Sequence, residues 1–364
     1  MTDHPRIRVG IIGLSAKRGW AAEGHLAALR ALGDRYELVA LSASSAESAA
    51  MAGEKYGISR CYGTAEELVN DPQVDLVTIA VKVPTHHALV RTALDAGKKV
   101  YCEWPLARDA AEAAEMANWT QEKRQLAVVG LQTRAAPAIR YARDLVRDGY
   151  VGKVLSTTMV ASAGAWADVT DEASAYLNEI GNGATMLSIP FGHAVDALNY
   201  VLGEWAEAKA VMGVRRPEVK IMPSGATMEK TAPDQIVVSG TLEGGAVACL
   251  HYRGGMSRST NFLWEINGTD GDLVFTAPVG HPQSMPLMLR GAQGADALAE
   301  LEVPARYSVA PDVPPGRPFN LAQAYAQLAD DIRSGEATVP DFALATRRHV
   351  FLDAMLASAN FPQA

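Results

Sequence analysis

The first third of the chain alternates short apolar runs with amphipathic stretches, and this alternation limits the fold more than any other feature. Five runs are rich in β-branched residues and almost continuously apolar, as strands buried on both faces are. They read "IRVGIIG", "YELVALSA", "VDLVTIAVKVP", "KKVYCEW" and "QLAVVGLQ". Helical segments such as "AEGHLAALRAL" and "HHALVRTALDAG" separate them. This spacing predicts βαβ units and a parallel sheet over residues 1–131.

The turn after the first run, "VGIIGLSAKRGWAAEGHLAAL", departs from the G-x-G-x-x-G pattern of a dinucleotide-binding turn. Gly13 is present, but Ser15 stands where the second glycine is expected. A longer loop with Lys17, Arg18, Gly19 and Trp20 replaces the third glycine. It is still the first βα turn of a βαβαβ half, and the following helix N-terminus offers N–H groups to a phosphate. We therefore predict a Rossmann-type domain that binds NAD or NADP.

The pattern changes after residue 131. Extended runs such as "PDQIVVSGTLEGGAVACLHYRGG" and "NFLWEINGTDGDLVF" carry Gly244-Gly245 and Asp270-Gly271 between them, as hairpins do. Residues 132–320 are predicted to form an α+β domain with an open, mainly antiparallel sheet. The helices in residues 321–364 are expected to close the fold.

Composition narrows the class of protein. The 364 residues suit two domains, and 48% hydrophobic with 20% charged residues is ordinary for a globular enzyme. A net charge of −8 without a basic run argues against a nucleic-acid partner. No apolar run is long enough for a membrane span, and no signal peptide opens the chain. The three cysteines do not have the spacing of a disulfide framework, which favours a reducing compartment such as the cytoplasm. No metal site is predicted.

The cofactor type is normally decided just after the second strand. A carboxylate there binds the ribose hydroxyls of NAD, whereas an arginine accepts the 2′-phosphate of NADP. This chain has Ala43 and Ser44 at that point, so neither sign is present. Because the arginine is missing, we lean slightly toward NAD.

Polar residues follow two further strands. Ligands of open α/β sheets bind beyond the carboxyl ends of the strands, where "VKVPTHH" and "YCEWPLA" place several side chains. These are Lys82, His86, His87, Glu103 and Trp104. A carboxylate such as Glu103, just past a buried strand, needs a partner.

The order of segments resembles the glucose–fructose oxidoreductase/inositol dehydrogenase/MocA (Gfo/Idh/MocA) family over nearly the whole chain. "AGKKVYCEWPLA" is similar to the family's A-G-K-x-V-x-x-E-K-P-L signature, and "FGHAVDAL" to its H-x-x-D helix. Trp104 replaces the signature lysine, and Ile189 stands where the family has an aspartate. These departures, together with the segments "GLSAKRGWA" and "INGTDGDL", are similar to one branch of the family. This branch contains the yeast galactose-regulon repressor and its bacterial relatives.

The resemblance implies that residues 132–320 serve substrate binding and dimerisation. The exposed face of their sheet is expected to make the contact in a homodimer or larger homo-oligomer.

The resemblance also implies site residues. His193 is the expected proton-transfer group, since an ordinary histidine pKa near ~6.5 suits that role. Lys82 and Tyr176 are alternative catalytic groups, and Tyr176 with Trp166 is a candidate sugar-stacking wall. The expected cofactor-binding residues are Gly13, Ser15, Lys17, Arg18, Trp20, Ser42, Ser44, Val81, Lys82, Pro84, His87, Glu103, Trp104 and Gln132.

Three functions are open at this stage. The first is an NAD(P)-dependent oxidoreductase that acts on a sugar, polyol or glycoside by hydride transfer. The second is an NAD-dependent, redox-neutral glycoside hydrolase that uses transient oxidation at the third carbon of the sugar. The third is a non-catalytic, nucleotide-binding sensor of a sugar regulon.

Overall fold

The computed structural model describes residues 5–17 and 19–361. Two compact units make up the chain: Met1–Gln132 with Val309–His349, and Thr133–Ser308 with Val350–Ala364. The predicted border near residue 131 lies beside the first border of these units. The segment 321–364, predicted as a separate closing element, is instead divided between the two units at His349.

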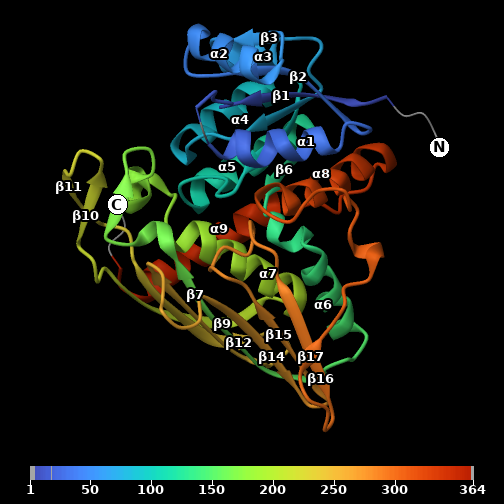
Figure 1. Ribbon diagram of the computed structural model, residues 1–364, viewed down its shortest axis with the longest axis vertical. Coiled ribbons are helices and arrows are strands. Elements are labelled where there is room, and N and C mark those ends of the chain that lie inside the picture. The colour runs from blue at the N-terminus through green and yellow to red at the C-terminus, as the bar shows by residue number, and fades with distance from the viewer. Residues whose placement is uncertain (1–4, 18, 362–364) are drawn as a thin grey trace. The chain divides into compact units, whose positions relative to one another are not determined.

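The first unit contains a six-stranded parallel sheet in the order β3-β2-β1-β4-β5-β6 (Figure 1). This is the strand order of dinucleotide-binding folds, with its reversal between β1 and β4. The strands are β1 (Ile7–Ile12), β2 (Tyr36–Ser42), β3 (Arg60–Tyr62), β4 (Leu76–Ile79), β5 (Lys99–Glu103) and β6 (Ala127–Gly130). The predicted Rossmann-type domain is therefore confirmed. The short β3 was not foreseen from the sequence.

Helices join these strands and cover the sheet. The turn after β1 leads into a π-helical segment, Ala21–Leu26, that continues as α1. The helices of this unit are α1 (Ala27–Ala31), α2 (Ala46–Tyr56), α3 (Ala65–Val69), α4 (His86–Asp95), α5 (Ala110–Lys123) and α8 (Arg317–Ser334). Helix α9 (Phe342–Ser358) belongs to this unit as far as His349 and to the second unit from Val350. Side chains at the ends of α2, α3 and α5 cap their first turns, which satisfies N–H groups that the helices leave open.

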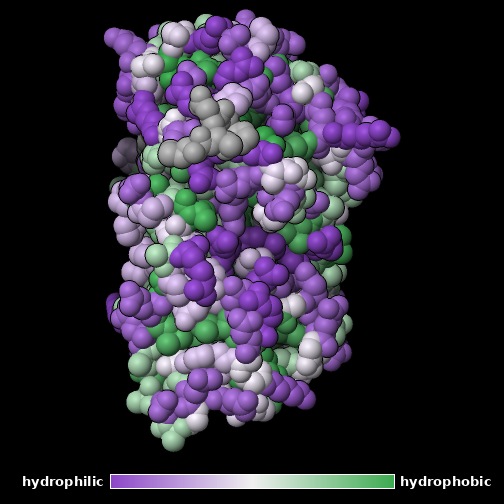
Figure 2. Space-filling model, turned by 90° about the vertical axis from the view of Figure 1, so that its right-hand side faces the viewer, coloured by the Kyte–Doolittle hydropathy of each residue, from purple (hydrophilic) through white to green (hydrophobic). Residues whose placement is uncertain are grey.

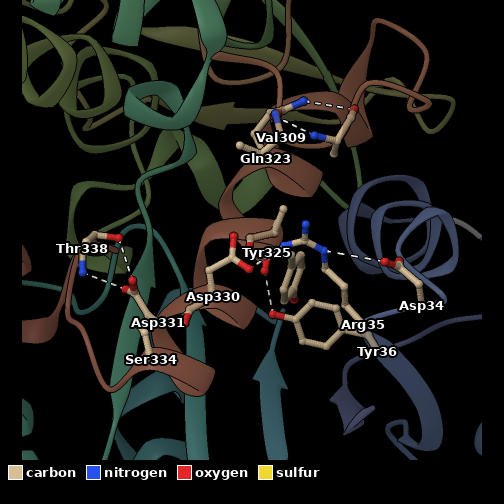
Figure 3. A network of polar contacts seen from close by, with 12 residues as sticks. Asp34, Arg35, Tyr36, Val309, Gln323, Tyr325, Asp330, Asp331, Ser334 and Thr338 are labelled. Carbon is tan, nitrogen blue, oxygen red and sulfur yellow. Dashed lines mark hydrogen bonds and ion pairs between the residues drawn. The ribbon is translucent and has the colours of Figure 1, made fainter. Parts of the chain in front are cut away.

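Helix α8 belongs to the first unit although it lies almost 200 residues after β6 in the chain. Figure 3 shows the polar contacts that hold it. The Tyr36 hydroxyl donates to the carbonyl of Tyr325 at 2.7 Å, and Arg35 pairs with Asp330 at 2.9 Å. The small residues of α8, such as Ala322 and Ala326, are completely buried, so the helix packs closely on the first core.

The second unit is built on an eight-stranded sheet in the order β17-β16-β15-β14-β7-β13-β12-β9. Only β7 and β13 run parallel within it, so the sheet is mixed and mainly antiparallel. Its strands are β7 (Val154–Ala163), β9 (Trp205–Gly213), β12 (Gln235–Leu242), β13 (Val247–Gly254), β14 (Phe262–Gly268), β15 (Gly271–Thr276), β16 (Met288–Gln293) and β17 (Ala299–Glu300).

Both predicted hairpins are present in this sheet. Gly244 and Gly245 lie in the turn between β12 and β13, and Asp270 lies in the turn between β14 and β15. A small second sheet and two helices complete the unit. They are β8 (Val169–Asp171), β10 (Glu218–Met222), β11 (Thr227–Glu229), α6 (Pro137–Arg147) and α7 (Gly192–Leu202).

The two faces of the large sheet differ in burial. On β13, Ala248, Leu250 and Tyr252 are completely buried, whereas Val247 on the opposite face is 59% exposed. This alternation is the period-2 pattern of a sheet with one face on a core. On the side drawn in Figure 2, hydrophilic residues predominate and hydrophobic ones occur in small groups. Within the described residues, no helix is long and apolar enough to cross a membrane.

Candidate functional site

The turn after β1 requires glycine at position 13. Gly13 has φ +98°, a conformation that residues with a side chain rarely adopt. A Cβ there would lie 2.5 Å from Cγ1 of Val81 and 2.7 Å from the carbonyl oxygen of Ala80. The Gly13 N–H donates to the carbonyl of Ser42 at 3.0 Å. The first glycine of the dinucleotide-binding turn therefore keeps its geometric role.

The lengthened loop after Gly13 is anchored by the end of α2. The Tyr56 hydroxyl donates to the Ser15 carbonyl at 2.9 Å, and Lys55 Nζ donates to the Ala16 carbonyl at 2.6 Å. The Ser15 hydroxyl accepts from the Lys17 N–H at 3.2 Å. Serine at position 15 thus folds the loop back on itself, while the Lys17 side chain stays exposed. Arg18 lies outside the described residues.

Trp20 closes the loop over the start of the following helix. A Cβ at Gly24 would lie 3.2 Å from Cε2 of Trp20, so the indole lies directly against this glycine. The ring meets His25 edge-on, with centroids 6.3 Å apart. The buried indole Nε1 has no hydrogen-bond partner in the described part of the chain. Trp20 therefore presents an unsatisfied donor beside the predicted nucleotide-binding turn.

The end of β2 and the loop after it carry three serines, Ser42, Ser44 and Ser45. Ser42 is buried and its backbone carbonyl accepts from the Gly13 N–H, whereas Ser44 is exposed. Ser45 caps α2, accepting from the Ser48 N–H at 3.1 Å. None of these hydroxyls carries a charge that would select between a ribose and a 2′-phosphate.

A buried histidine joins the loops that follow β4 and β5. His86 Nε2 lies 3.1 Å from the Val81 carbonyl, and its Nδ1 lies 3.1 Å from that of Pro105. Burial lowers the His86 pKa, partly opposed by these carbonyls and by the nearby Glu103 charge. His86 thus holds Val81 and the residues after Trp104 in place. Lys82 and Pro84, in the first of these loops, are exposed.

His87 faces away from this loop junction, toward helix α5. Its Nε2 lies 2.9 Å from a carboxylate oxygen of Glu115, and its ring lies 4.7 Å from that of Trp119. His87 therefore connects α4 with α5. These contacts do not support its predicted role in cofactor binding.

Trp104, the replacement for the signature lysine, is 4% exposed. Its ring lies 4.6 Å from the ring of His349 on α9, and the Ala107 N–H donates to His349 Nε2 at 3.3 Å. Burial lowers the pKa of His349 to about 3, so its imidazole is neutral and can accept this hydrogen bond. Trp104 is therefore packed on a second ring of the same unit, where it cannot transfer a proton.

Glu103 and Gln132 end two adjacent strands of the first unit. Glu103 is 8% exposed, and its Oε1 lies 3.1 Å from Nε2 of His25. Gln132 is 2% exposed, and its amide oxygen has no hydrogen-bond partner in the parts of the chain that the structure describes. An unsatisfied buried amide is costly, so Gln132 fits a position completed by a bound group.

In the second unit, helix α7 carries His193 in a buried setting. The residue is 2% exposed, and its Nδ1 has no hydrogen-bond partner among residues 5–17 and 19–361. Burial is the main cause that lowers the His193 pKa to about 3; the Asp196 charge opposes the shift, and His281 adds a smaller lowering. The assumption of an ordinary pKa near ~6.5 is therefore wrong for this structure. His193 is neutral over the physiological range.

The aspartate of the H-x-x-D motif binds an arginine. Nε of Arg134 donates to Oδ2 of Asp196 at 2.7 Å, and the second guanidinium nitrogen, Nη2, contacts Oδ1. Arg134 also lies over the ring of Tyr200, 4.9 Å from its centroid. Asp196 thus acts as a buried anchor between the start of the second unit and α7.

Tyr176 and Trp166 lie in the same unit as His193. Tyr176 is partly buried, and burial raises the pKa of its phenol, which makes it a neutral donor rather than a base. Trp166 is 1% exposed, its Nε1 donates to the Leu177 carbonyl at 3.0 Å, and its ring stacks on His281. Trp166 is therefore enclosed and does not present the open stacking face expected of a sugar wall.

Sequence reasoning missed the structural roles of several histidines. His25, His281 and His349 were not singled out, although each contacts a predicted site residue or its support. His25 had one available signal, since it lies in the helix directly after the glycine turn. Among the described residues, no group of three or more His, Cys, Asp or Glu side chains could hold a metal ion.

Comparison with known proteins identifies the family. The family model described as "Oxidoreductase family, NAD-binding Rossmann fold" matches residues 7–131, and "Gal80p, C-terminal domain" matches residues 137–277. The dehydrogenase aclE of Aspergillus oryzae is 31% identical over 285 residues, which cover 75% of this chain and 77% of the relative. The chain belongs to the Gfo/Idh/MocA oxidoreductase family.

Other members of the family are similar in sequence or in fold. The galactose/lactose metabolism regulatory protein GAL80 of Saccharomyces cerevisiae is 28% identical over 304 residues, covering 78% of this chain and 69% of that protein. The structure of a Gal80p super-repressor mutant matches 98% of this chain and 96% of its own, with TM-score 0.88 and 23% identity. Levoglucosan dehydrogenase in complex with NADH and L-sorbose matches 98% and 99%, with TM-score 0.85 and 21% identity.

Proposed function

We propose that this protein is an NAD(P)-dependent oxidoreductase that acts on a sugar, a polyol or a glycoside. The observation that carries the proposal is the turn at Gly13, where any Cβ would meet Val81 and Ala80. The first glycine of a dinucleotide-binding fingerprint makes this tight turn between a strand and a helix, whose N-terminal N–H groups can then face a phosphate. The buried, unsatisfied Trp20 Nε1 and Gln132 Oε1 add two positions that a bound dinucleotide can complete.

The substrate class is inferred from relatives. Levoglucosan dehydrogenase of Pseudarthrobacter phenanthrenivorans is 25% identical over 65% of this chain, and 1,5-anhydro-D-fructose reductase of Ensifer adhaerens is 28% identical over 80%. Both names describe oxidation or reduction of a carbohydrate. A hydroxylated ring with a secondary alcohol is therefore the substrate that we propose.

His193 is the proposed proton-transfer residue. The nicotinamide, when bound, accepts or gives the hydride. As the C–H bond of a secondary alcohol breaks, its O–H becomes strongly acidic, because a protonated carbonyl holds its proton weakly. The neutral, unpartnered Nδ1 of His193 can then accept the proton despite a pKa of about 3. Lys82 and Tyr176 remain alternative proposals.

We propose NAD rather than NADP as the cofactor. The loop after β2 presents Ala43, Ser44 and Ser45, without a cation for a 2′-phosphate. The free cysteines Cys61, Cys102 and Cys249 suit a reducing compartment, which is why we place the protein in the cytoplasm.

A catalytically silent sensor is the second candidate function. It is favoured by the match of residues 137–277 to the Gal80p C-terminal domain and by Trp104 in place of the signature lysine. The two functions differ in turnover, so the test is a measurement of reaction rather than of binding.

The experiment uses a panel of sugars, polyols and aryl glycosides, each with NAD⁺ and with NADP⁺. Absorbance at 340 nm reports net reduction of the cofactor, and release of the aryl group reports glycoside cleavage. A rise at 340 nm supports the oxidoreductase. Aryl release without that rise supports the redox-neutral hydrolase. Dinucleotide binding without either signal on any substrate contradicts both enzyme proposals and favours the sensor.

A further inference from the structure

A buried polar chain connects the helix after the glycine turn with the carboxyl end of β5. His25 is completely buried in the π-helical segment and lies between two polar neighbours. Its Nδ1 lies 2.8 Å from the Tyr325 hydroxyl, and its Nε2 lies 3.1 Å from Oε1 of Glu103. The Tyr325 hydroxyl is in turn 2.9 Å from that of Thr78.

The Glu103 carboxylate, at one end of this row of polar side chains, determines where the hydrogens lie. A carboxylate only accepts hydrogen bonds, so the ring nitrogen that faces Glu103 must carry a hydrogen. With that hydrogen on Nε2, Nδ1 accepts from the Tyr325 hydroxyl, which leaves the Tyr325 oxygen to accept from the Thr78 hydroxyl. The Nε2–Oε1 contact departs from linear hydrogen-bond geometry, and its contribution is therefore mainly electrostatic.

Aromatic rings fix the imidazole in this position. The Tyr101 and Tyr325 rings stack with centroids 4.8 Å apart, and the ring of His25 meets Tyr101 at 5.5 Å and Tyr325 at 5.8 Å, edge-on. All three side chains are completely buried. His25 therefore has little freedom to turn, and its Nε2 points to one place.

The same geometry restricts the Glu103 carboxylate. Gly130 lies opposite Glu103 on β6, and a Cβ at Gly130 would lie 2.6 Å from Oε1. Oε1 is buried between Gly130 and His25, although 11% of the side chain is exposed. The exposed part can thus present Oε2 at the carboxyl edge of the sheet, beyond which dinucleotides bind.

We propose that His25 is a positioning residue that holds Glu103 as an acceptor for the nicotinamide–ribose half of the dinucleotide. β4 and β5 belong to the second half of the sheet, whereas the adenosine half of a dinucleotide lies over the β1–β2 side. Oε2 of Glu103 accepts from a ribose hydroxyl or the carboxamide of the nicotinamide half. This inference rests on the proposed dinucleotide binding.

The test compares the affinities of NADH and ADP, since ADP lacks the nicotinamide half. In His25→Asn, the shorter amide reaches the position of Nδ1 but not that of Nε2. We expect NADH binding to weaken roughly three- to tenfold, as for one lost polar contact, while ADP affinity stays unchanged. His25→Gln places an amide N–H near the position of Nε2, and it should restore most of the NADH affinity.

Equal losses of NADH and ADP affinity in His25→Asn would mean a purely structural role and would overturn the proposal. So would unchanged NADH binding, or no recovery in His25→Gln. If His25→Asn does not fold, Tyr325→Phe removes the hydroxyl beside Nδ1 and keeps the ring. It should weaken NADH more than ADP, and an unchanged ratio overturns the proposal. Absence of dinucleotide binding in the native protein instead contradicts the proposed function.

Discussion

The carboxylate of Asp196 is held by the guanidinium of Arg134, through Nε at 2.7 Å and through Nη2. The Asp196 side chain has no exposed surface, and that of Arg134 is 14% exposed. A buried carboxylate that loses its arginine partner keeps the cost of burying a charge without the compensation from that ion pair. We therefore expect this buried ion pair to contribute more to the free energy of unfolding of the second unit than the exposed ion pairs do.

The first prediction concerns this pair. Arg134→Met should lower the free energy of unfolding by ~3–5 kcal/mol, because Asp196 remains buried without its counter-ion. The double variant Arg134→Met/Asp196→Leu should be more stable than the single one, since it removes both charges. Urea denaturation measures both values. A single variant within ~0.5 kcal/mol of the native protein would contradict the importance of this pair.

The second prediction tests the turn at Gly13. Gly13→Ala places a Cβ 2.5 Å from Val81 and forces a residue with a side chain to φ +98°, so the turn must change shape. Strain of this kind costs roughly 1–3 kcal/mol, and we expect NADH binding to weaken at least ~10-fold.

Gly33→Ala is the matched control for this variant. Its new Cβ would lie 3.4 Å from the nearest atom, the Arg30 carbonyl oxygen, and the position needs no left-handed backbone. Calorimetric titration with NADH should show unchanged affinity for Gly33→Ala. Equal affinities of the Gly13 and Gly33 variants would contradict the role of the turn.

The fold could be predicted from sequence to a large extent, because periodicity alone identifies its main elements. Continuous apolar runs predict β1, β2, β4, β5 and β6. The turn dipeptides Gly244-Gly245 and Asp270-Gly271 predict the β12–β13 and β14–β15 hairpins. The three-residue β3 is too short to show a period. Helix α8 could be predicted as a helix, but its place on the first unit depends on tertiary contacts of Arg35 and Tyr36.

The site was less predictable because its contacts join residues far apart in the sequence. Arg134 and Asp196 are 62 positions apart, and His25 meets Tyr325 across 300 positions. No spacing rule connects such residues. The burial of His193 did have a signal, since "SIPFGHAVDALNYVL" is apolar on every side of a helix. That signal argues against an ordinary pKa.

The third prediction is a loss of stability in acid. The His193 and His349 pKa values are about 3 in the folded protein, against ~6.5 for an unfolded chain. Below pH ~6.5 the unfolded chain therefore binds protons that the folded protein does not. The free energy of unfolding decreases as the pH is lowered from ~6.5 to about 3. The slope is up to ~1.4 kcal/mol per pH unit for each histidine, and these groups have no effect above pH ~7.

Urea denaturation between pH 7.5 and pH 5 measures this slope. His193→Gln and His349→Gln each remove one group that cannot charge in the folded state, and each should make the decline less steep. The double variant His193→Gln/His349→Gln should show the sum of the two changes in slope if the two histidines titrate independently. A decline as steep in both variants as in the native protein would show that other groups cause it.

The fourth prediction concerns assembly through the open face of the large sheet. Val211, Val247 and Met288 are 73%, 59% and 50% exposed. The strand register places them on one face, because Val211 lies opposite Val237, and Val237 opposite His251. Because they share one face, a second copy of the chain that covers this face would bury all three side chains. We propose that this face forms the contact of a homodimer.

Val211→Glu should convert the dimer to a monomer at micromolar concentration, as measured by sedimentation velocity. Val350→Glu is a suitable control, because Val350 is 54% exposed but lies on helix α9 rather than on the sheet. A native protein that sediments as a monomer contradicts the proposal. An effect of Val350→Glu equal to that of Val211→Glu would assign the contact to a different surface.

The last prediction tests His193 as the proton-transfer residue. His193→Ala should lower turnover by ~10²–10⁴-fold, the usual loss when a positioned acid or base is removed. NADH affinity should stay close to native, because the proposed role of His193 is proton transfer from the substrate rather than cofactor binding. With a pKa of about 3, His193 is already neutral at pH 5, so kcat/KM for oxidation should show no inflection from it between pH 5 and pH 9. Stopped-flow turnover across this range measures both effects.

An inflection near pH 6.5 that is absent from His193→Gln would contradict the buried, neutral state. Native turnover in His193→Ala would exclude His193 as the proton acceptor, and Lys82 and Tyr176 would be tested in its place.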